Sequence, residues 1–240
     1  MMVKSINAAD TFRSMFNALP SPVFVVDGDV TVHDYNTGLM WQQTPVNTGF
    51  SWQEAVDYCE SLELAVYDDW RMPTLKELFS ISDYSQGWPY LDTTYFDIAG
   101  LSVSKDEQYW ADDYYIGTTV EGGSAAAFGV NHGTGHIKAY PAGAFGPMGN
   151  YVRAVRGNTS YGVNDFVDNC DGTVTDDTAG LMWQQADNGS GMDWEEALAY
   201  AEGSTVAGYD DWRLPNVKEL QSIVDYTRSP IPPVPVMKRT

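Results

Sequence analysis

The same sequence pattern occurs twice in this chain. Residues 34–43 (DYNTGLMWQQ) return at 176–185 as DDTAGLMWQQ, and the register then holds without a gap. Between 27–84 and 169–226, just over half of the aligned positions are identical. Self-similarity at a fixed offset is the signature of a duplicated structural unit. We therefore expect two copies of one module instead of a single fold.

The two copies differ in length. The first continues well beyond Tyr84, to Arg156, whereas the second reaches the last residue, Thr240, soon after Tyr226. The short segment after Tyr226 includes four prolines, which cannot donate hydrogen bonds to a central strand. The second copy is therefore expected to be truncated. The expected segments are an N-terminal extension (1–21), a complete module (22–157), a truncated second module (158–229) and a proline-rich tail (230–240).

The composition narrows the classes of partner. The chain has 33 acidic and 13 basic residues, a net charge of −20, which repels phosphate backbones and anionic membrane surfaces. No apolar run is long enough to span a membrane, and residues 1–26 show no pattern typical of a signal peptide. We expect no nucleic-acid partner and no membrane insertion. Cys59 lies in a predicted helix and Cys170 in a predicted turn, so both thiols are expected to be free.

Each copy is predicted to begin with a β-hairpin and two helices. β-branched residues flank turns at 27–29 and 171–172, which indicates the hairpins. Ser51 and Thr74 each have a glutamate three residues later, which is typical of a capping box at a helix start, and Asp193 and Asn216 repeat this pattern. Residues 85–156 have short apolar runs between long polar stretches, which favours short strands and loops. The predicted fold class is α+β.

These motifs resemble the Lcl C-terminal domain family, named from a bacterial collagen-like adhesin. The resemblance rests on residues 37–41 (TGLMW), 67–73 (YDDWRMP), 76–78 (KEL) and 151–156 (YVRAVR), with 171–176 (DGTVTD) and 212–215 (WRLP) in the second copy. It implies a C-type lectin-like relative with two helices, a twisted antiparallel sheet and a long loop region, in a secreted or cell-surface protein. The family commonly pairs the cysteine that matches Cys59 with one in the last strand, where this chain has Ala154.

The candidate ligand-binding residues lie in the 102–150 region. Aromatic rings beside carboxylates and amides suit sugars, because rings stack on sugar faces while oxygens accept hydroxyl hydrogen bonds. We therefore expect a non-enzymatic recognition or adhesion module for a carbohydrate or protein ligand. The candidate residues are Tyr109, Asp112, Asp113, Tyr114, Tyr115, Asn131 and His132.

Two other functions fit the same residues less well. One is a structural interaction or assembly module, for example in a homo-oligomer. The other is a hydrolase or oxidase that works in the same loops, although motifs of nucleophilic or nucleotide-dependent catalysis are absent. The spacing of His132 and His136 is that of metal ligands on a helix, but Gly133 and Gly135 between them disfavour a helix.

Two further motifs give weaker evidence of a functional site. Asp168, Asp171 and Asp176 surround the turn at Gly172 and are weak calcium candidates, since calcium loops combine carboxylates with a turn glycine. An ordinary hairpin turn is the alternative. The Trp-Arg-x-Pro motif with its nearby glutamate occurs in both copies, so we interpret it as a folding element in which the arginine is held by the carboxylate.

Overall fold

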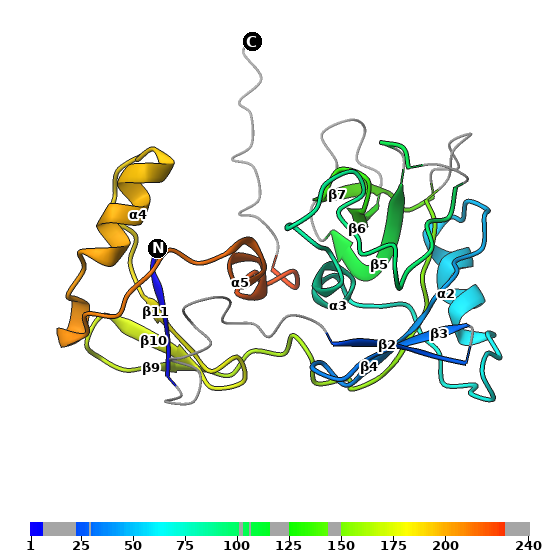
Figure 1. Ribbon diagram of the computed structural model, residues 1–240, viewed down its shortest axis with the longest axis horizontal. Helices are drawn as coiled ribbons and strands as arrows, with labels where there is room; N and C mark the ends of the chain where they lie inside the picture. Colours follow the sequence, from blue (N-terminus) through cyan, green and yellow to red (C-terminus); the bar gives the residue numbers. More distant parts are fainter. Residues whose placement is uncertain are drawn as a thin grey trace, which may run out of the picture. The chain divides into compact units, whose positions relative to one another are not determined.

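The computed structural model describes residues 1–6, 23–28, 30–100, 103–105, 107–115, 125–143 and 150–228. The chain forms two compact units (Figure 1). Module 1 contains the described residues from 23 to 161 together with 225–228, and module 2 contains 162–224 together with the N-terminal residues 1–6. Both modules combine short antiparallel sheets with short helices, which confirms the α+β class.

The framework of module 1 is a four-stranded antiparallel sheet in the order β2-β3-β4-β8. The predicted hairpin is present, and Gly28 adopts a φ of 63° in its turn, a left-handed conformation that suits glycine. The strand β4 is buried at every residue, as its apolar sequence predicts. The strands are β2 (Phe24–Asp27), β3 (Thr31–Asp34), β4 (Leu39–Gln42) and β8 (Val155–Gly157).

The two helices of module 1 begin where the capping pattern predicts. They are α2 (Trp52–Glu60) and α3 (Leu75–Ser80). Ser51 and Thr74 are their N-caps, and both make the reciprocal capping-box hydrogen bonds with the glutamate three residues later. Cys59 is buried on α2, and burial raises the pKa of its thiol to about 12.

A second sheet covers the helices of module 1. It has three antiparallel strands, β5 (Gln108–Tyr115), β6 (Ala126–Asn131) and β7 (His136–Pro141). Helix α3 packs against β5 and β6, and α2 packs against β5 (Figure 1). The sequence predicted short strands and loops in residues 85–156 but did not locate β7. The described parts of the 102–150 region therefore contain more strand structure than the sequence predicted.

Module 2 repeats the framework of module 1. Its strands are β9 (Phe166–Asp168), β10 (Thr173–Asp176) and β11 (Leu181–Gln184), and its helices are α4 (Trp194–Glu202), the 3-10 turn η1 (Val206–Gly208) and α5 (Val217–Ser222). Asp193 and Asn216 make the predicted capping boxes. Cys170 is exposed and, like Cys59, free. None of the helices in the described parts of the chain is long and apolar enough to cross a membrane.

The fourth strand of module 2 comes from the other end of the chain. Strand β1 (Val3–Ser5) pairs with β11, so the sheet has the order β1-β11-β10-β9 (Figure 1). Val3 lies opposite Trp183 in the register that Val155 of β8 has with Trp41 in module 1. Strand β1 therefore occupies in module 2 the place that β8 occupies in module 1.

Hydrogen bonds and charges of β1 also match those of β8. Val3 exchanges two backbone hydrogen bonds with Arg213, at 3.1 and 3.0 Å, as Val155 does with Arg71 at 2.9 Å each. Lys4 forms an ion pair with Asp211 at 2.8 Å and lies over the Tyr209 ring. In module 1 the equivalent group is Arg156, which pairs with Asp69 at 2.6 Å and lies over the Tyr67 ring. Among the described residues, module 2 thus lacks only a counterpart of the β5–β7 sheet and the chain around it.

Candidate functional site

Tyr109, a predicted ligand-binding residue, is part of the core. Its side chain is fully buried, and its hydroxyl donates to Glu107 Oε2 at 3.1 Å and accepts from the Ala99 amide at 2.9 Å. Burial raises the pKa of this phenol. The prediction that Tyr109 offers its ring to a ligand is therefore corrected: the ring belongs to the hydrophobic core of module 1, and its hydroxyl is already paired.

Asn131 and His132 are buried as well, which corrects their prediction as ligand-binding residues. Asn131 closes the β6–β7 turn, because its Nδ2 donates to the Lys105 carbonyl at 2.6 Å and its Oδ1 accepts from the Thr134 amide at 2.8 Å. The His132 ring lies 5.1 Å from the Tyr109 ring, and burial lowers the pKa of His132 to about 3.

The glycines beside His132 explain this burial. A Cβ at Gly133 would lie 2.3 Å from the Ser104 carbonyl, and one at Gly135 would lie 2.7 Å from the Tyr90 ring. The glycines that disfavour a helix here thus permit a turn that folds tightly against the rest of module 1. The sequence analysis used these glycines only as a sign that the segment is not helical.

Two predicted residues do lie on the surface, at a bulge in β5. The register between β5 and β6 shifts between Trp110 and Tyr114, and this irregularity contains the exposed Asp112. Tyr114 is 43% exposed, and its ring centroid lies 4.2 Å from that of Trp52 on α2. The indole nitrogen of Trp52 donates to the Ala111 carbonyl at 2.9 Å, which fixes this half-buried ring.

We call Trp52, Asp112 and Tyr114 the bulge surface. Although Asp112 is exposed, the surrounding protein partly removes water from its carboxyl group. This desolvation, together with the charge of Asp113, raises the pKa of the Asp112 carboxyl group. Arg71 acts in the opposite direction. Sequence reasoning missed Trp52, because this residue lies at a predicted helix start, outside the 102–150 region that supplied the candidates. Its contact with Tyr114 depends on long-range packing of α2 against β5.

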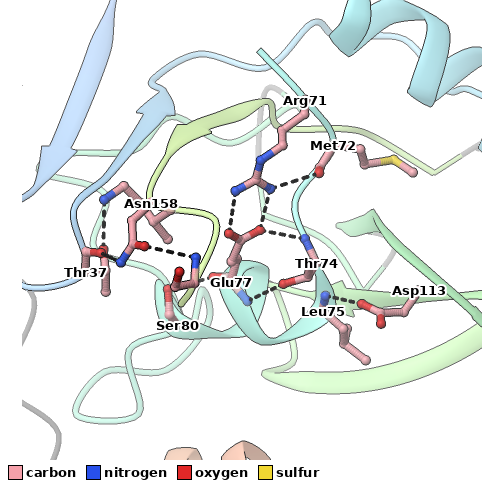
Figure 2. A network of polar contacts seen from close by, with 11 residues as sticks. Thr37, Arg71, Met72, Thr74, Leu75, Glu77, Ser80, Asp113 and Asn158 are labelled. Atoms are coloured by element: carbon pink, nitrogen blue, oxygen red, sulfur yellow. Dashed lines mark hydrogen bonds and ion pairs between the residues drawn. The ribbon is translucent and has the colours of Figure 1, made fainter. Parts of the chain in front are cut away.

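Asp113 and Tyr115 have mainly structural contacts. The Asp113 carboxylate accepts a hydrogen bond from the amide of Leu75, the first residue of α3, at 2.5 Å (Figure 2). Burial raises the pKa of Asp113. The Tyr115 ring is half-buried and meets Phe128 edge-on at 5.6 Å. These contacts of the two predicted residues are therefore within module 1.

The repeated Trp-Arg-x-Pro motif is confirmed as a folding element. Figure 2 shows Arg71 holding Glu77 with two parallel hydrogen bonds, at 2.7 and 2.6 Å, while Glu77 also accepts from the Thr74 amide at 2.8 Å. Arg213 and Glu219 make the same pair in module 2, at 2.8 and 2.6 Å. Both glutamates are buried, so these paired charges are internal connections.

The three calcium candidates do not come together. In the β9–β10 ladder, Asp168 lies opposite Val174 and Asp176 opposite Phe166, so these two side chains belong to different rungs. Asp171 accepts from the amide and hydroxyl of Thr173, at 3.0 and 2.6 Å. Throughout the described ranges, no group of three or more histidine, cysteine or acidic side chains is arranged to hold a metal ion. The calcium hypothesis is therefore replaced by the alternative, a hairpin turn with internally bonded aspartates.

Comparison with known proteins gives one match. The family described as the Lcl C-terminal domain matches residues 30–156 and, a second time, residues 172–238. Neither the curated proteins nor the solved structures include a significant match to this chain. The two matched ranges correspond to the two copies that the internal repeat defines.

Proposed function

Because the chain belongs to the Lcl C-terminal domain family, we propose that it is a non-enzymatic recognition module of the adhesin kind, secreted or displayed at a cell surface. Module 1 is the recognition unit in this proposal, and its fold is a relative of the C-type lectin-like domains. The two helices, the antiparallel sheets and the long connections around β5–β7 support that relationship. The family name supports adhesion in general and leaves the ligand open.

The proposed ligand is a carbohydrate, bound at the bulge surface. The supporting observation is that the Trp52 and Tyr114 rings lie 4.2 Å apart at the β5 bulge, which also contains the exposed Asp112. A sugar stacks on aromatic faces, and a carboxylate accepts hydrogen bonds from its hydroxyl groups. The net charge of −20 favours neutral or basic glycans over sulfated ones, because like charges oppose encounter.

The test compares two tyrosines. An array of neutral, basic and sulfated glycans is first probed with the full chain to identify a ligand. Tyr114→Ala is then expected to weaken binding of that ligand at least about tenfold while leaving the unfolding transition nearly unchanged. Tyr35→Ala is the control, since Tyr35 is also exposed but lies at the end of β3. Equal binding by wild type and Tyr114→Ala, or chemical conversion of a bound glycan, would overturn the proposal.

A further inference from the structure

In module 1 the β5–β7 sheet covers a specific set of apolar side chains. Leu75 and Leu78 of α3 are both fully buried, and Trp52 of α2 is half-buried with its indole nitrogen bonded to the Ala111 carbonyl of β5. Helix α3 packs against β5 and β6, so these residues form the contact between the framework and the sheet.

In module 2 the same positions are exposed. Trp194, Val217 and Leu220 occupy the positions of Trp52, Leu75 and Leu78, and they are 70%, 41% and 44% exposed. Val224, at the position of Ser82, is 40% exposed. We call Trp194, Val217, Leu220 and Val224 the open face. No residue in the described part of the chain accepts a hydrogen bond from the Trp194 indole in the way that Ala111 accepts one from Trp52.

The exposure is selective, because the remaining framework of module 2 is intact. Trp212 is buried like Trp70, and Ala201 is buried like Cys59. The Arg213–Glu219 pair is also present. The buried residues and the Arg213–Glu219 pair thus hold the helices of the open face as their counterparts do in module 1. The covering layer is missing among the described residues. An apolar surface of this kind on an otherwise folded unit indicates a binding site.

We propose that the open face binds a β-sheet segment of the β5–β7 type, which module 2 does not have among its described residues. Module 1 provides the template, since an antiparallel sheet brings small buried side chains such as Ala111 and Ala127 to this face and offers a main-chain carbonyl to the indole. The partner segment therefore needs small apolar residues on one face of a strand and a free carbonyl beside them.

Strand β1 shows that module 2 accepts a segment from elsewhere in the sequence. It occupies the β8 place with the register and hydrogen bonds of β8, although it consists of residues 3–5 and its partner β11 of residues 181–184. A second copy of this chain is a poorer partner. Its β5–β7 sheet already covers its own Leu75 and Leu78, and two chains of net charge −20 repel each other.

The first experiment adds a polypeptide with the sequence of residues 103–143 to the full chain. The expected result is a saturable shift of the Trp194 indole NMR signal and at least about tenfold slower hydrogen exchange of the α5 amides, because docking removes this face from water. Leu220→Asp is expected to abolish both effects. Val163→Asp is the matched control, since Val163 is 60% exposed in module 2 but lies outside the open face.

A second arm joins the partner segment to the chain itself. Residues 87–152 are placed directly after Arg228, in the position that residues 87–152 have after Gln86 in module 1, and the same protection of α5 and Trp194 is expected. Absence of protection in both arms would overturn the proposal, as would protection that survives Leu220→Asp. A wild-type dimer that Leu220→Asp converts to a monomer would also overturn it, because the occupant would then be a second copy.

Discussion

Modules 1 and 2 have the same framework but differ in one layer. Both have a four-stranded antiparallel sheet, two capped helices and a buried arginine–glutamate pair. Only module 1 has the β5–β7 sheet among the described residues. The comparison separates residues that the framework needs from residues that the sheet needs. Trp70 and Trp212 are buried in both modules, whereas Leu78 is fully buried and its counterpart Leu220 is 44% exposed.

This separation assigns the strongest sequence motif to the framework. Arg71 and Glu77 have the appearance of a reactive pair, yet Arg213 and Glu219 repeat their geometry in module 2, whose described residues include no counterpart of the β5–β7 sheet. Their common role is to connect the strand before the helix with the helix start. The bulge surface, in contrast, depends on β5, so a recognition site of this kind is expected in module 1 and not in the described part of module 2.

The largest expected effect concerns β1. Val3→Asp places a carboxylate at a fully buried position, and an unpaired buried charge costs about 3–5 kcal/mol. We expect module 2 to unfold while module 1 stays folded. Hydrogen exchange of the full chain, read separately for β10–β11 and for β3–β4, measures this difference.

The control for Val3→Asp is Ile6→Asp in the same segment. The Ile6 side chain is 37% exposed, so its replacement is expected to leave the exchange of β10 and β11 nearly unchanged. If Val3→Asp protects β10 and β11 as well as wild type does, β1 is not the strand that completes module 2.

The sequence predicted the local parts of both modules well. The hairpins and the helix starts at Ser51, Thr74, Asp193 and Asn216 follow from turn residues and capping boxes, whose effects extend over three or four residues. The long-range pairings have no such signal. Strand β1 has no local feature that marks it as a partner of β11, and β7 begins in a segment whose glycines indicate a loop.

The candidate site was predicted in part for the same reason. Asp112 and Tyr114 are exposed, whereas Tyr109, Asn131 and His132 are buried and Trp52 was not among the candidates. Polar and aromatic residues in one segment show which chemistry is available. The face that each one occupies depends on the β5 bulge and on packing against α2 and α3, and neither is visible in the spacing of the residues.

A smaller effect should distinguish the modules at acid pH. His132 is buried in module 1, its pKa is lowered to about 3 by burial and by Arg153, and module 2 has no histidine among its described residues. An unfolded histidine has a pKa of about 6.5, so between about pH 6.5 and 3 the unfolded state binds a proton that the folded state does not. The free energy of unfolding of module 1 therefore falls as the pH falls, by about 2 kcal/mol between pH 7 and 5 from this residue.

The measurement for His132 is urea unfolding of wild type and of His132→Gln at pH 7 and pH 5. The raised carboxyl pKa values of Glu107, Asp112 and Asp113 have the opposite sign, since these groups bind protons more readily in the folded state. The two proteins share those groups, so the difference between their pH responses isolates His132. Equal responses would show that this ring is not kept neutral by burial. His33→Gln serves as the control, because His33 lies on β3 outside the buried cluster.

The smallest expected effect compares two tight turns. Val66 and Gly208 are equivalent positions, and both adopt left-handed backbone, with φ of 66° and 81°. This conformation costs a residue with a Cβ about 1–2 kcal/mol, and the Val66 side chain is fully exposed, so no packing offsets that cost. Glycine loses about 0.5–1 kcal/mol through its greater freedom when unfolded. Val66→Gly is therefore expected to stabilise module 1 by about 0.5–1 kcal/mol.

The reverse change, Gly208→Val, tests the same reasoning in module 2. A Cβ at Gly208 has no neighbour within 4 Å, so the substitution changes the backbone preference without a steric clash, and we expect it to destabilise module 2 by about 0.5–1 kcal/mol. Val66→Ala is the intermediate control, since alanine lacks the β-branch but still has a Cβ. Urea unfolding, with hydrogen exchange measured for each module, gives the change in stability of module 1 and of module 2 separately. Two changes of the same sign would mean that the turns differ in more than the residue at this position.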